Sequence, residues 1–300
     1  MALNPIVIER GLRVEFARLM AQWQAARQIN PGLMGAAMVI QSNGAYEKMG
    51  WLGAMPAVRQ YLGELNPKML NDYDYTVRNL DWEASVLVNQ NDLDDDQTGT
   101  IQMIPGFLVD RIMAHPEKLM IALATGGTSG LAYDGVAFFS NASGARTIDN
   151  LLAGTGVDTL AHMDADLNAA IVAMAGFTDD QGEALNIQGD TIWCPKAQEN
   201  NWRRLVDSTA DPTVTSGNTF NPYSGKFTVI GDARLDAVDA TDWYLLATKE
   251  QVKPFVFSRR QIAQPSFEKK PASKLWIASA DGRWNAGYGL PHLAVKTVNS

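Results

Sequence analysis

The stretch YDYTVRNLDWEASVLV at residues 73–88 decides the fold, together with the apolar pattern that follows it. Apolar side chains recur at every second position, first over 73–77 and again over 82–88. A period of two residues is typical of strands that bury one face. The sequence therefore predicts two successive, half-buried strands here.

Between Gly99 and Gly127 the apolar residues recur every three or four positions instead. That spacing predicts a long helix. The residues that carry it are Ile101, Ile104, Leu108, Ile112, Leu119, Met120 and Leu123. Because Pro105, Gly106 and Pro116 must start, bend or interrupt such a helix, we expect a kinked or two-part element.

Further elements are expected on both sides of this pair. They are an amphipathic helix over 12–23, an extended excursion broken by Gly and Pro over 50–70, a helix over 159–175 capped by Asp158 or Thr159, a strand over 191–194, a helix from Pro195 to about Val206, a polar loop over 207–225, strands over 227–230 and 243–247, and strand-like pieces separated by turns over 252–294. Strands and helices do not alternate regularly, so the predicted class is α+β. Residues 158–248 have elements of their own and could be a subdomain inserted between two parts of another.

The amino-acid composition is that of an ordinary soluble globular chain. Its 300 residues are 46% hydrophobic and 19% charged, and the formal net charge is -8. An acidic balance argues against a surface that grips nucleic-acid phosphates. The single cysteine, Cys194, excludes an intrachain disulfide framework, and three histidines leave little for a metal site. With no signal-peptide core and no membrane-length apolar stretch, we expect a protein that is cytosolic or assembled from the cytosol.

The charge is distributed unevenly along the chain. Residues 1–60 carry six basic and three acidic side chains, and 249–300 carry nine basic and three acidic ones. By contrast, 71–100 carry one basic and eight acidic residues, and 158–248 carry five basic and fourteen acidic ones. Basic ends and acidic middle regions could attract each other within a fold or between copies of it. Solvated surface faces that happen to cluster explain the same distribution.

No motif points to catalysis or to a cofactor. Phosphate-loop, dinucleotide, zinc-protease and nucleophile-elbow signatures are absent. Asp92, Asp94 and Asp96 superficially resemble a calcium loop, but Gln97 stands where Gly is required and Met103 where Glu is required. The acidic run is then either a cap for the following helix or a contact for a basic segment of a neighbour.

Cys194 offers one alternative from another functional class. It follows a short strand, and a thiolate at a strand-to-helix turn can be a nucleophile if a histidine lies beside it. Ile192 and Trp193 precede it, however, and a free cysteine in such a context usually packs in a core. A cysteine-dependent hydrolase would lose turnover in a Cys194→Ala variant, whereas a structural protein would still assemble.

Several segments together resemble the major head subunit of Mu-like phages, the gpT family, which has the Hong Kong 97 type of phage capsid fold. They are Trp51-Leu52-Gly53 followed by Pro56, Arg59 and Gly63; Tyr75-Thr76-Val77-Arg78-Asn79 with Trp82-Glu83; Asp94-Asp95-Asp96 and Gly99; Tyr133-Asp134-Gly135 with Phe138-Phe139-Ser140; Asn221-Pro222-Tyr223-Ser224-Gly225; Trp243-Tyr244-Leu245-Leu246; and Arg283, Asn285, Ala286 and Gly287. Each is weak alone, but their order and spacing are specific.

The resemblance implies a division of the chain. Residues 1–48 would be an N-terminal arm, 49–92 the region of an extended hairpin called the E-loop, 93–157 a peripheral domain with a spine helix over 97–125, 158–248 an axial domain, and 249–300 the return to the peripheral domain. It also implies a structural protein without enzymatic activity, cofactor or metal. Hexamers and pentamers of one subunit would close into an icosahedral head.

The expected partners are further copies of the chain, a scaffold, a protease, a portal and decoration proteins, with double-stranded DNA enclosed but not bound by sequence and no membrane. The expected location is the virion, after assembly in the cytoplasm of the host bacterium. An encapsulin-like cellular shell is the remaining alternative. The charged residues nominated for subunit contacts are Arg10, Arg13, Arg18, Arg27, Arg59, Asp94, Asp95, Asp96, Arg259, Arg260, Lys269 and Lys270.

Overall fold

A computed structural model describes residues 32–52, 72–91, 104–141, 148–178, 182–213 and 219–299, together with Arg146 and five positions between 14 and 25. In chain order the elements are η1 (Gly32–Ala36), β1 (Ala37–Gln41), β2 (Tyr46–Leu52), β3 (Asp72–Arg78), β4 (Leu80–Asn89), α3 (Ile104–Thr125), η3 (Gly126–Thr128), β5 (Leu151–Ala153), α4 (Leu160–Ala175), β6 (Thr191–Pro195), η4 (Lys196–Gln198), α5 (Glu199–Asp207), β7 (Thr228–Asp232), α6 (Ala233–Asp236), β8 (Trp243–Leu246), β9 (Phe255–Lys269), β10 (Leu275–Tyr288), η5 (Pro291–Leu293) and β11 (Ala294–Val298).

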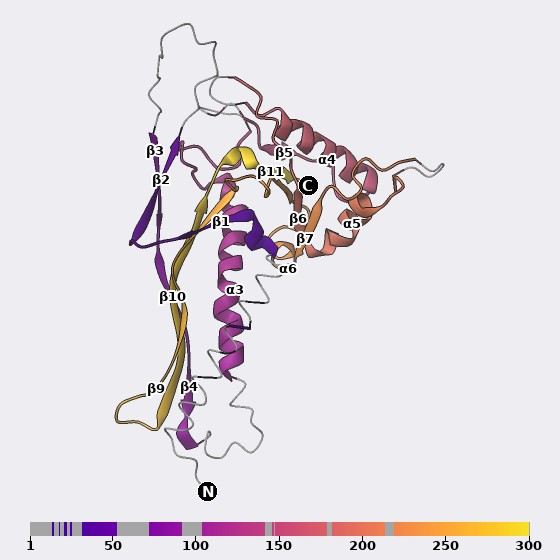
Figure 1. Cartoon of the computed structure of the whole chain (residues 1–300). Helices are drawn as coiled ribbons and strands as arrows, with labels where there is room; N and C mark the ends of the chain where they lie inside the picture. The colour runs from indigo at the N-terminus through magenta and orange to yellow at the C-terminus, as the bar shows by residue number, and fades with distance from the viewer. Residues whose placement is uncertain are drawn as a thin grey trace, which may run out of the picture.

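One part of the molecule is an elongated blade, made of α3 and a four-stranded sheet in the order β1-β9-β10-β4 (Figure 1). β9 and β10 are antiparallel strands of 15 and 14 residues, and β4 pairs antiparallel with β10 along its whole length. The two faces of β4 differ in burial. The inward face carries Trp82, Ala84, Val86 and Val88, and the exposed face carries Glu83, Ser85 and Leu87. The predicted alternation over 73–77 and 82–88 is therefore confirmed as β3 and β4.

The prediction of short strand-like pieces over 252–294 is wrong, because β9 and β10 are long and nearly continuous. Pro265 interrupts the strand-like sequence pattern of β9. In β10 the pattern is irregular between Asp281 and Trp284, where the pairing register with β9 shifts. β1 pairs with β9 only up to Arg259, so within the described ranges the later half of β9 has no strand on that side. An edge strand tolerates a proline whose missing N–H faces away from the sheet.

The helix α3 lies along the blade as a single element, which excludes the two-part alternative (Figure 1). Pro105 lies in its first turn and Pro116 in its interior. A proline in a helix interior removes the hydrogen bond to the carbonyl four residues earlier. Packing compensates, because α3 contributes side chains to the main core: Val109, Ile112, Met120, Ile121 and Ala124 are buried there.

A second sheet in the order β5-β11-β8-β6-β7 forms the other lobe of the molecule. α4 and α5 cover one of its faces, and α3 reaches the other. Along β6, Ile192 and Cys194 belong to the cluster with α4 and α5, whereas Trp193 belongs to the cluster with α3. A strand buried on both faces has no polar alternation, which explains the continuously apolar sequence of β8, Trp243–Leu246.

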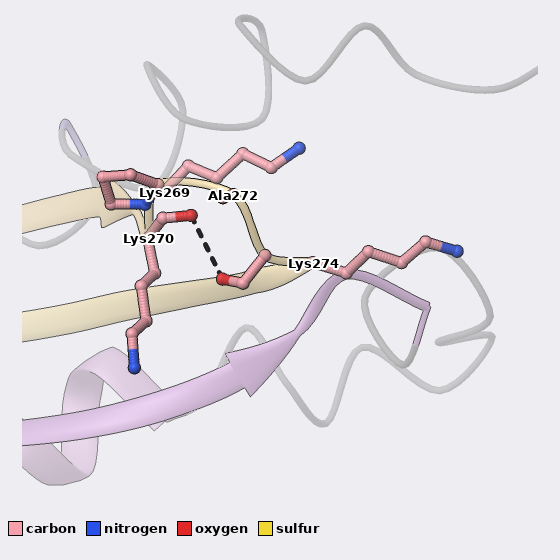
Figure 2. Close-up of a pocket in the computed structure, with 6 residues that line it drawn as sticks. Lys269, Lys270, Ala272 and Lys274 are labelled. Carbon is pink, nitrogen blue, oxygen red and sulfur yellow. Dashed lines mark hydrogen bonds between the residues drawn. The ribbon is translucent and has the colours of Figure 1, made fainter.

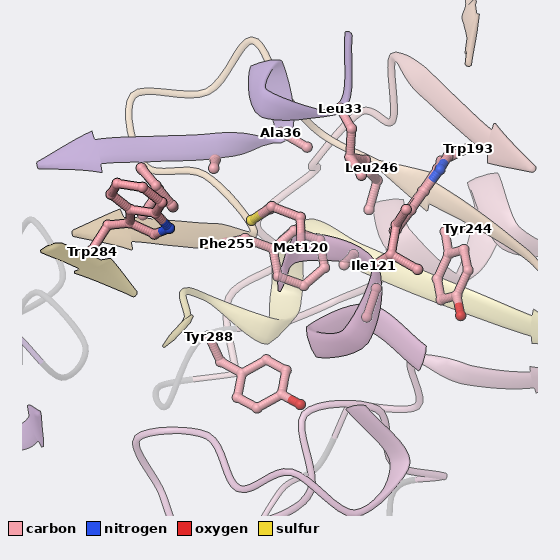
Figure 3. Close-up of a cluster of buried hydrophobic side chains, with 14 of the residues drawn as sticks. Leu33, Ala36, Met120, Ile121, Trp193, Tyr244, Leu246, Phe255, Trp284 and Tyr288 are labelled. Atoms are coloured by element: carbon pink, nitrogen blue, oxygen red, sulfur yellow. The ribbon is translucent and has the colours of Figure 1, made fainter. Parts of the chain in front are cut away.

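The main core lies where the blade meets this second sheet. Met120 and Ile121 from α3 pack between Phe255 and Tyr288 of the blade and Tyr244 of β8 (Figure 3). Phe138 stacks on Tyr288 with ring centroids 4.8 Å apart. One continuous apolar cluster therefore joins the two sheets, and burial of this kind contributes about 1.5–3 kcal/mol for each large side chain.

The helices of the second lobe begin close to the expected positions. Thr159 caps α4, and its side chain accepts a hydrogen bond from the His162 amide, as one of the two predicted caps requires. Pro195 does not open the following helix, because it is the last residue of β6 and pairs with Asp232. A short 3-10 turn at Lys196 precedes α5 instead.

Sheet membership crosses the domain boundaries expected from the resemblance. β1 lies within the expected arm, yet it pairs with β9 as a strand of the blade. Ala36 just before it and Ala37 at its start are buried in the main core. β5 and β11 lie outside 158–248, yet they pair with each other and join the sheet through β8. The inserted block therefore does not hold a complete sheet by itself.

A two-stranded ribbon of β2 and β3 leads to the Gly- and Pro-rich excursion, most of which lies outside the described residues. Asn79, at 4% exposure, fixes the base of the ribbon to the blade. Its Nδ2 donates to Ser42 Oγ at 2.8 Å, and its Oδ1 accepts from Ser258 Oγ at 2.8 Å.

The expected helix over 12–23 falls largely outside the described residues, including every residue of its apolar stripe. The positions that are described in this region are helical and exposed: Val14, Arg18, Ala21, Gln22 and Ala25.

Candidate subunit-interface surfaces

The hairpin between β9 and β10 ends in a turn that presents three lysines, Lys269, Lys270 and Lys274 (Figure 2). The turn is internally bonded, since the Lys270 amide donates to the Leu275 carbonyl at 2.9 Å and Ser273 Oγ donates to the Lys270 carbonyl at 3.1 Å. Figure 2 shows the three lysine side chains pointing in different directions from the turn. Residues 269–274 line a shallow hollow with a volume of about 560 Å³. We call residues 269–274 the lysine tip.

Two of the three lysine ammonium groups contact neutral side chains. Lys269 Nζ donates to Gln90 Oε1 at 2.9 Å and lies 5.7 Å from the centroid of the Trp276 ring. Lys274 Nζ lies 3.5 Å from Asn91 Oδ1. Within the part of the chain that the structure describes, no ion pair is formed by these lysines. The lysine tip therefore presents positive charge that its described neighbours do not neutralise.

Arg259 and Arg260 lie far from the lysine tip, on the opposite half of β9. Arg259 Nε donates to Gln41 Oε1 at 3.3 Å, and Gln41 Nε2 donates to the Arg260 carbonyl at 3.3 Å. Ten residues separate Arg259 from Lys269, which corresponds to about 33 Å along a strand. The structure therefore divides these four nominated cations between two surfaces. Lys274, which the nomination did not include, joins the first of them.

Most of the other nominated residues lie outside the described ranges. These are Arg10, Arg13, Arg27, Arg59, Asp94, Asp95 and Asp96. Arg18 is described, and it is exposed at a helical position. Asn91 is the last described residue before the acidic run, and it lies beside Lys274. Asp94, Asp95 and Asp96 follow Asn91 by three to five positions in the sequence.

The segment that carries Tyr133-Asp134-Gly135 and Phe138-Phe139 is held by an ion pair between the buried Arg146 and the half-buried Asp134. Arg146 Nε and Nη2 donate to the two oxygens of Asp134 at 2.8 and 2.7 Å. Arg146 Nη1 also donates to the carbonyls of Ala137 and Phe138 at 2.8 and 2.9 Å. Burial raises the pKa of Asp134, but hydrogen bonds from Arg146 and the Val136 amide outweigh it and lower that pKa overall. The charged pair thus fixes the loop that places Phe138 in the core.

Asn150 ties the same segment to the second sheet. It is completely buried, and its Nδ2 donates to the carbonyls of Phe138, Pro291 and Ala294 at 2.9, 3.1 and 3.2 Å. Its Oδ1 accepts from the Ser140 amide at 2.8 Å. Sequence reasoning missed both Arg146 and Asn150, because irregular segments carry no periodicity that marks a buried polar residue.

Cys194 does not have the surroundings of a nucleophile. Its side chain is completely buried, and its Sγ lies 3.8 Å from the Ile230 carbonyl. Burial, with the nearby charge of Glu199, raises the pKa of the thiol to about 12. The charged groups around it are Glu199, Arg203, Asp236 and Lys196, and none of these is a histidine. Cys194 is a core residue, so the hydrolase alternative loses its catalytic group.

The described residues contain no group of three or more side chains of the types that hold a metal ion. Nor does any helix in these ranges combine the length and the apolar character of a membrane span.

The blade, its long hairpin and the second lobe define a class of protein: the fold is that of phage capsid proteins of the Hong Kong 97 type. A chain of the procapsid of bacteriophage JBD30 superposes with a TM-score of 0.52 at 20% identity, over 99% of this chain and 77% of that one. A chain of the capsid of cyanophage P-SCSP1u gives a TM-score of 0.61 at 8% identity, over 88% and 86%. At these identities the likeness establishes the fold alone.

The sequence places the chain more narrowly, because it belongs to the Mu-like prophage major head subunit gpT family, whose model matches residues 12–155 and 231–300. The major capsid protein of Escherichia phage Mu is 27% identical over 103 residues, which cover 34% of each chain. The Mu-like prophage FluMu major head subunit of Haemophilus influenzae is 22% identical over 265 residues, 86% of this chain and 63% of that protein. The chain thus spans less than two thirds of either curated relative. The resemblance to the gpT family is confirmed, and its members are structural proteins rather than enzymes.

Proposed function

We propose that this protein is the major capsid subunit of a tailed, Mu-like phage or prophage, and that its copies form the hexamers and pentamers of an icosahedral head around double-stranded DNA. The observation that carries the proposal is the coincidence of the gpT family match with the capsid fold in one chain. The same match favours a phage head over an encapsulin-like cellular shell.

The domain division fits this function after two adjustments. We assign the arm to residues before η1, the E-loop to the excursion that the β2–β3 ribbon begins, and the peripheral domain to the blade with α3 as its spine. The axial domain comprises the second sheet with α4 and α5, and it includes β5 and β11. A long blade and a broad second lobe give one subunit several separate surfaces for neighbours.

The partners follow from the same role. They are further copies of the chain first, and then a scaffold, a protease, a portal and decoration proteins. Location in the virion after assembly in the host cytoplasm belongs to the same proposal. The net charge of -8 suits a container that encloses DNA without gripping it, because negative charge repels phosphate.

Charge complementarity between segments provides part of the subunit contacts. The lysine tip is a surface for carboxylates, and the acidic run of Asp94, Asp95 and Asp96 is the segment that fits it, from the same subunit or an adjacent one. The basic arm, with Arg10, Arg13, Arg18 and Arg27, is a second candidate for the acidic run. Arg259 and Arg260 remain interface candidates on a separate surface of β9, and Arg59, which lies outside the described residues, remains a candidate from the sequence. Repeated in every subunit of a shell, such modest contacts add.

Particle formation tests the proposal. We expect the purified full-length chain, alone or with a co-expressed scaffold, to sediment as large particles together with capsomer-sized rings, and negative-stain images to show closed shells or rings. A chain that stays a stable monomer under every salt and scaffold condition would overturn the proposed function.

A further inference from the structure

The ring of His115, near the middle of α3, lies between two tryptophans of the blade sheet. Its centroid is 4.1 Å from that of Trp82 on β4 and 6.1 Å from that of Trp284 on β10. The indole Nε1 of Trp284 donates a hydrogen bond to His115 Nδ1 at 3.2 Å. This contact links the helix to the sheet at a polar point inside an otherwise apolar junction.

The two tryptophans are themselves fixed. Trp82 Nε1 donates to the Trp284 carbonyl at 2.9 Å, and Trp284 is 3% exposed. The Trp284 ring lies against Gly282, where a Cβ would come within 2.1 Å of it. Position 282 therefore has to be glycine for the Trp284 ring to lie there. The indole N–H of Trp284 could follow a displaced His115 ring only if the tryptophan itself repacked.

The hydrogen bond specifies the protonation state of His115. An Nδ1 that accepts a hydrogen bond carries no proton, so the ring is neutral with its N–H at Nε2. If Nδ1 were also protonated, its N–H and the indole N–H of Trp284 would both be donors, and the hydrogen bond between them would be lost. The contact with Trp284 therefore exists in one protonation state of His115 and not in the other.

The charges around the ring also favour the neutral state. Arg111 and Lys118 lie one turn away on α3, and Arg259 of β9 is the cross-strand partner of Trp284. Burial and the charge of Lys118 lower the pKa of His115 below its ordinary value of 6.5. Lys118, on the same helix, is therefore the charge that adds to the effect of burial on His115.

Carboxylates near the site are directed elsewhere. On β4, Asp81 and Glu83 alternate with Trp82 and lie on the opposite face of the sheet, where Asp81 pairs with Arg283 of β10. On α3 itself, Glu117 Oε2 lies 3.3 Å from Nη2 of Arg234 in α6. No described carboxylate is among the groups that shift the pKa of His115.

The position of His115 gives this contact a mechanical role. Pro116 follows it and removes one backbone hydrogen bond from the interior of α3. The helix at this point depends more on side-chain contacts, namely His115 towards the sheet and Glu117 towards Arg234.

We propose that His115 is a pH-responsive contact that fixes the middle of α3 to the blade sheet while it is neutral and releases it when it is protonated. Because burial and the charge of Lys118 lower the pKa of His115 in the folded protein, neutral His115 contributes stability that is fully present above pH 6.5 and is lost as the pH falls below that value. The contact lies within one chain, so it is independent of the proposed capsid function.

Hydrogen exchange of the full-length chain at pH 7.5 and pH 5.0 tests the proposal. After correction for the intrinsic pH effect, we expect amides of α3 around Pro116 to exchange at least five-fold faster at pH 5.0, while those of α4 stay unchanged. His115→Gln keeps an acceptor for Trp284 but does not titrate in this range, so it should abolish the response. His162→Gln removes the exposed histidine of α4, which pairs with Asp158, and should respond like the native chain.

An α3 that exchanges equally at both pH values in the native chain would overturn the proposal, and so would an undiminished response in His115→Gln. If the glutamine variant does not fold, the comparison of α3 with α4 within the native chain still decides the question. Trp284→Phe, which removes the indole donor and keeps an aromatic ring, should also abolish the response.

Discussion

Replacement of Arg146 by alanine is expected to destabilise the protein by about 3 kcal/mol, because it leaves the half-buried carboxylate of Asp134 and two backbone carbonyls without their charged donor. Asp134 would lose both hydrogen bonds from the guanidinium, and the carbonyls of Ala137 and Phe138 would lose their donor. The loop that positions Phe138 in the core is held by these bonds. The measurement is the midpoint of urea unfolding, followed by tryptophan fluorescence at a fixed protein concentration.

Arg204→Ala is the matched control, since Arg204 is exposed and should change stability by less than about 0.5 kcal/mol. Acid provides a second check on the pair. The pKa of Asp134 is lowered in the folded protein, so its contribution is present above the unfolded value near 3.8 and is lost as the pH falls below it. In Arg146→Ala this acid-dependent loss should shrink. Equal stability of the two variants would show that the ion pair does not hold this loop.

Reversal of the lysine tip is expected to lower the yield of assembled particles at least ten-fold while leaving the subunit folded. In the triple variant Lys269→Glu, Lys270→Glu, Lys274→Glu, a surface that now attracts carboxylates would repel them in every copy. The side chains are at the end of a hairpin and carry little of the core, so secondary structure should be unchanged. Particle yield by sedimentation and folding by circular dichroism are the two readouts.

The control reverses three exposed cations elsewhere, Arg204, Lys226 and Lys249, and changes the net charge equally. It should assemble like the native chain, whereas an equal loss in the control would assign the effect to net charge.

Reversal of Asp94, Asp95 and Asp96 to lysine should also reduce assembly, and the two reversals combined in one chain should restore it. Full assembly of either single reversal would contradict the pairing.

The source of the carboxylates is distinguished by mixing two variants. If the acidic run of one subunit neutralises the lysine tip of another, a mixture of the lysine-tip variant with the Asp94–96 variant should co-assemble. If the pairing occurs within one subunit, the mixture fails and the combined variant alone assembles.

The sequence was most informative where one face of an element is buried. Alternation over 73–77 and 82–88 predicted β3 and β4, because half-buried strands require it. The helix α4 was predicted with Asp158 or Thr159 as its cap, because both precede a regular apolar stripe, and the structure selects Thr159. The same reasoning failed for β9 and β10, where Pro265 and the register shifts near Asp281 disturb the pattern while pairing maintains the strands.

The candidate surfaces were predictable in part. Lys269 and Lys270 were nominated from charge alone, but Lys274 joins them because of the hairpin turn, which the short-strand prediction did not contain. Asp134 and Arg146 are twelve residues apart in an irregular segment, so no spacing rule connects them. Contacts made by turns and loops depend on tertiary structure, and a single sequence carries little signal for them.

Electron cryo-microscopy of the particles formed by the full-length chain tests the proposed capsid function. We expect closed icosahedral shells in which this fold is repeated in hexamers and pentamers, with the blade and the second lobe recognisable in each subunit. Monomers, small closed oligomers or amorphous aggregates at every salt concentration, with and without a co-expressed scaffold, would contradict it.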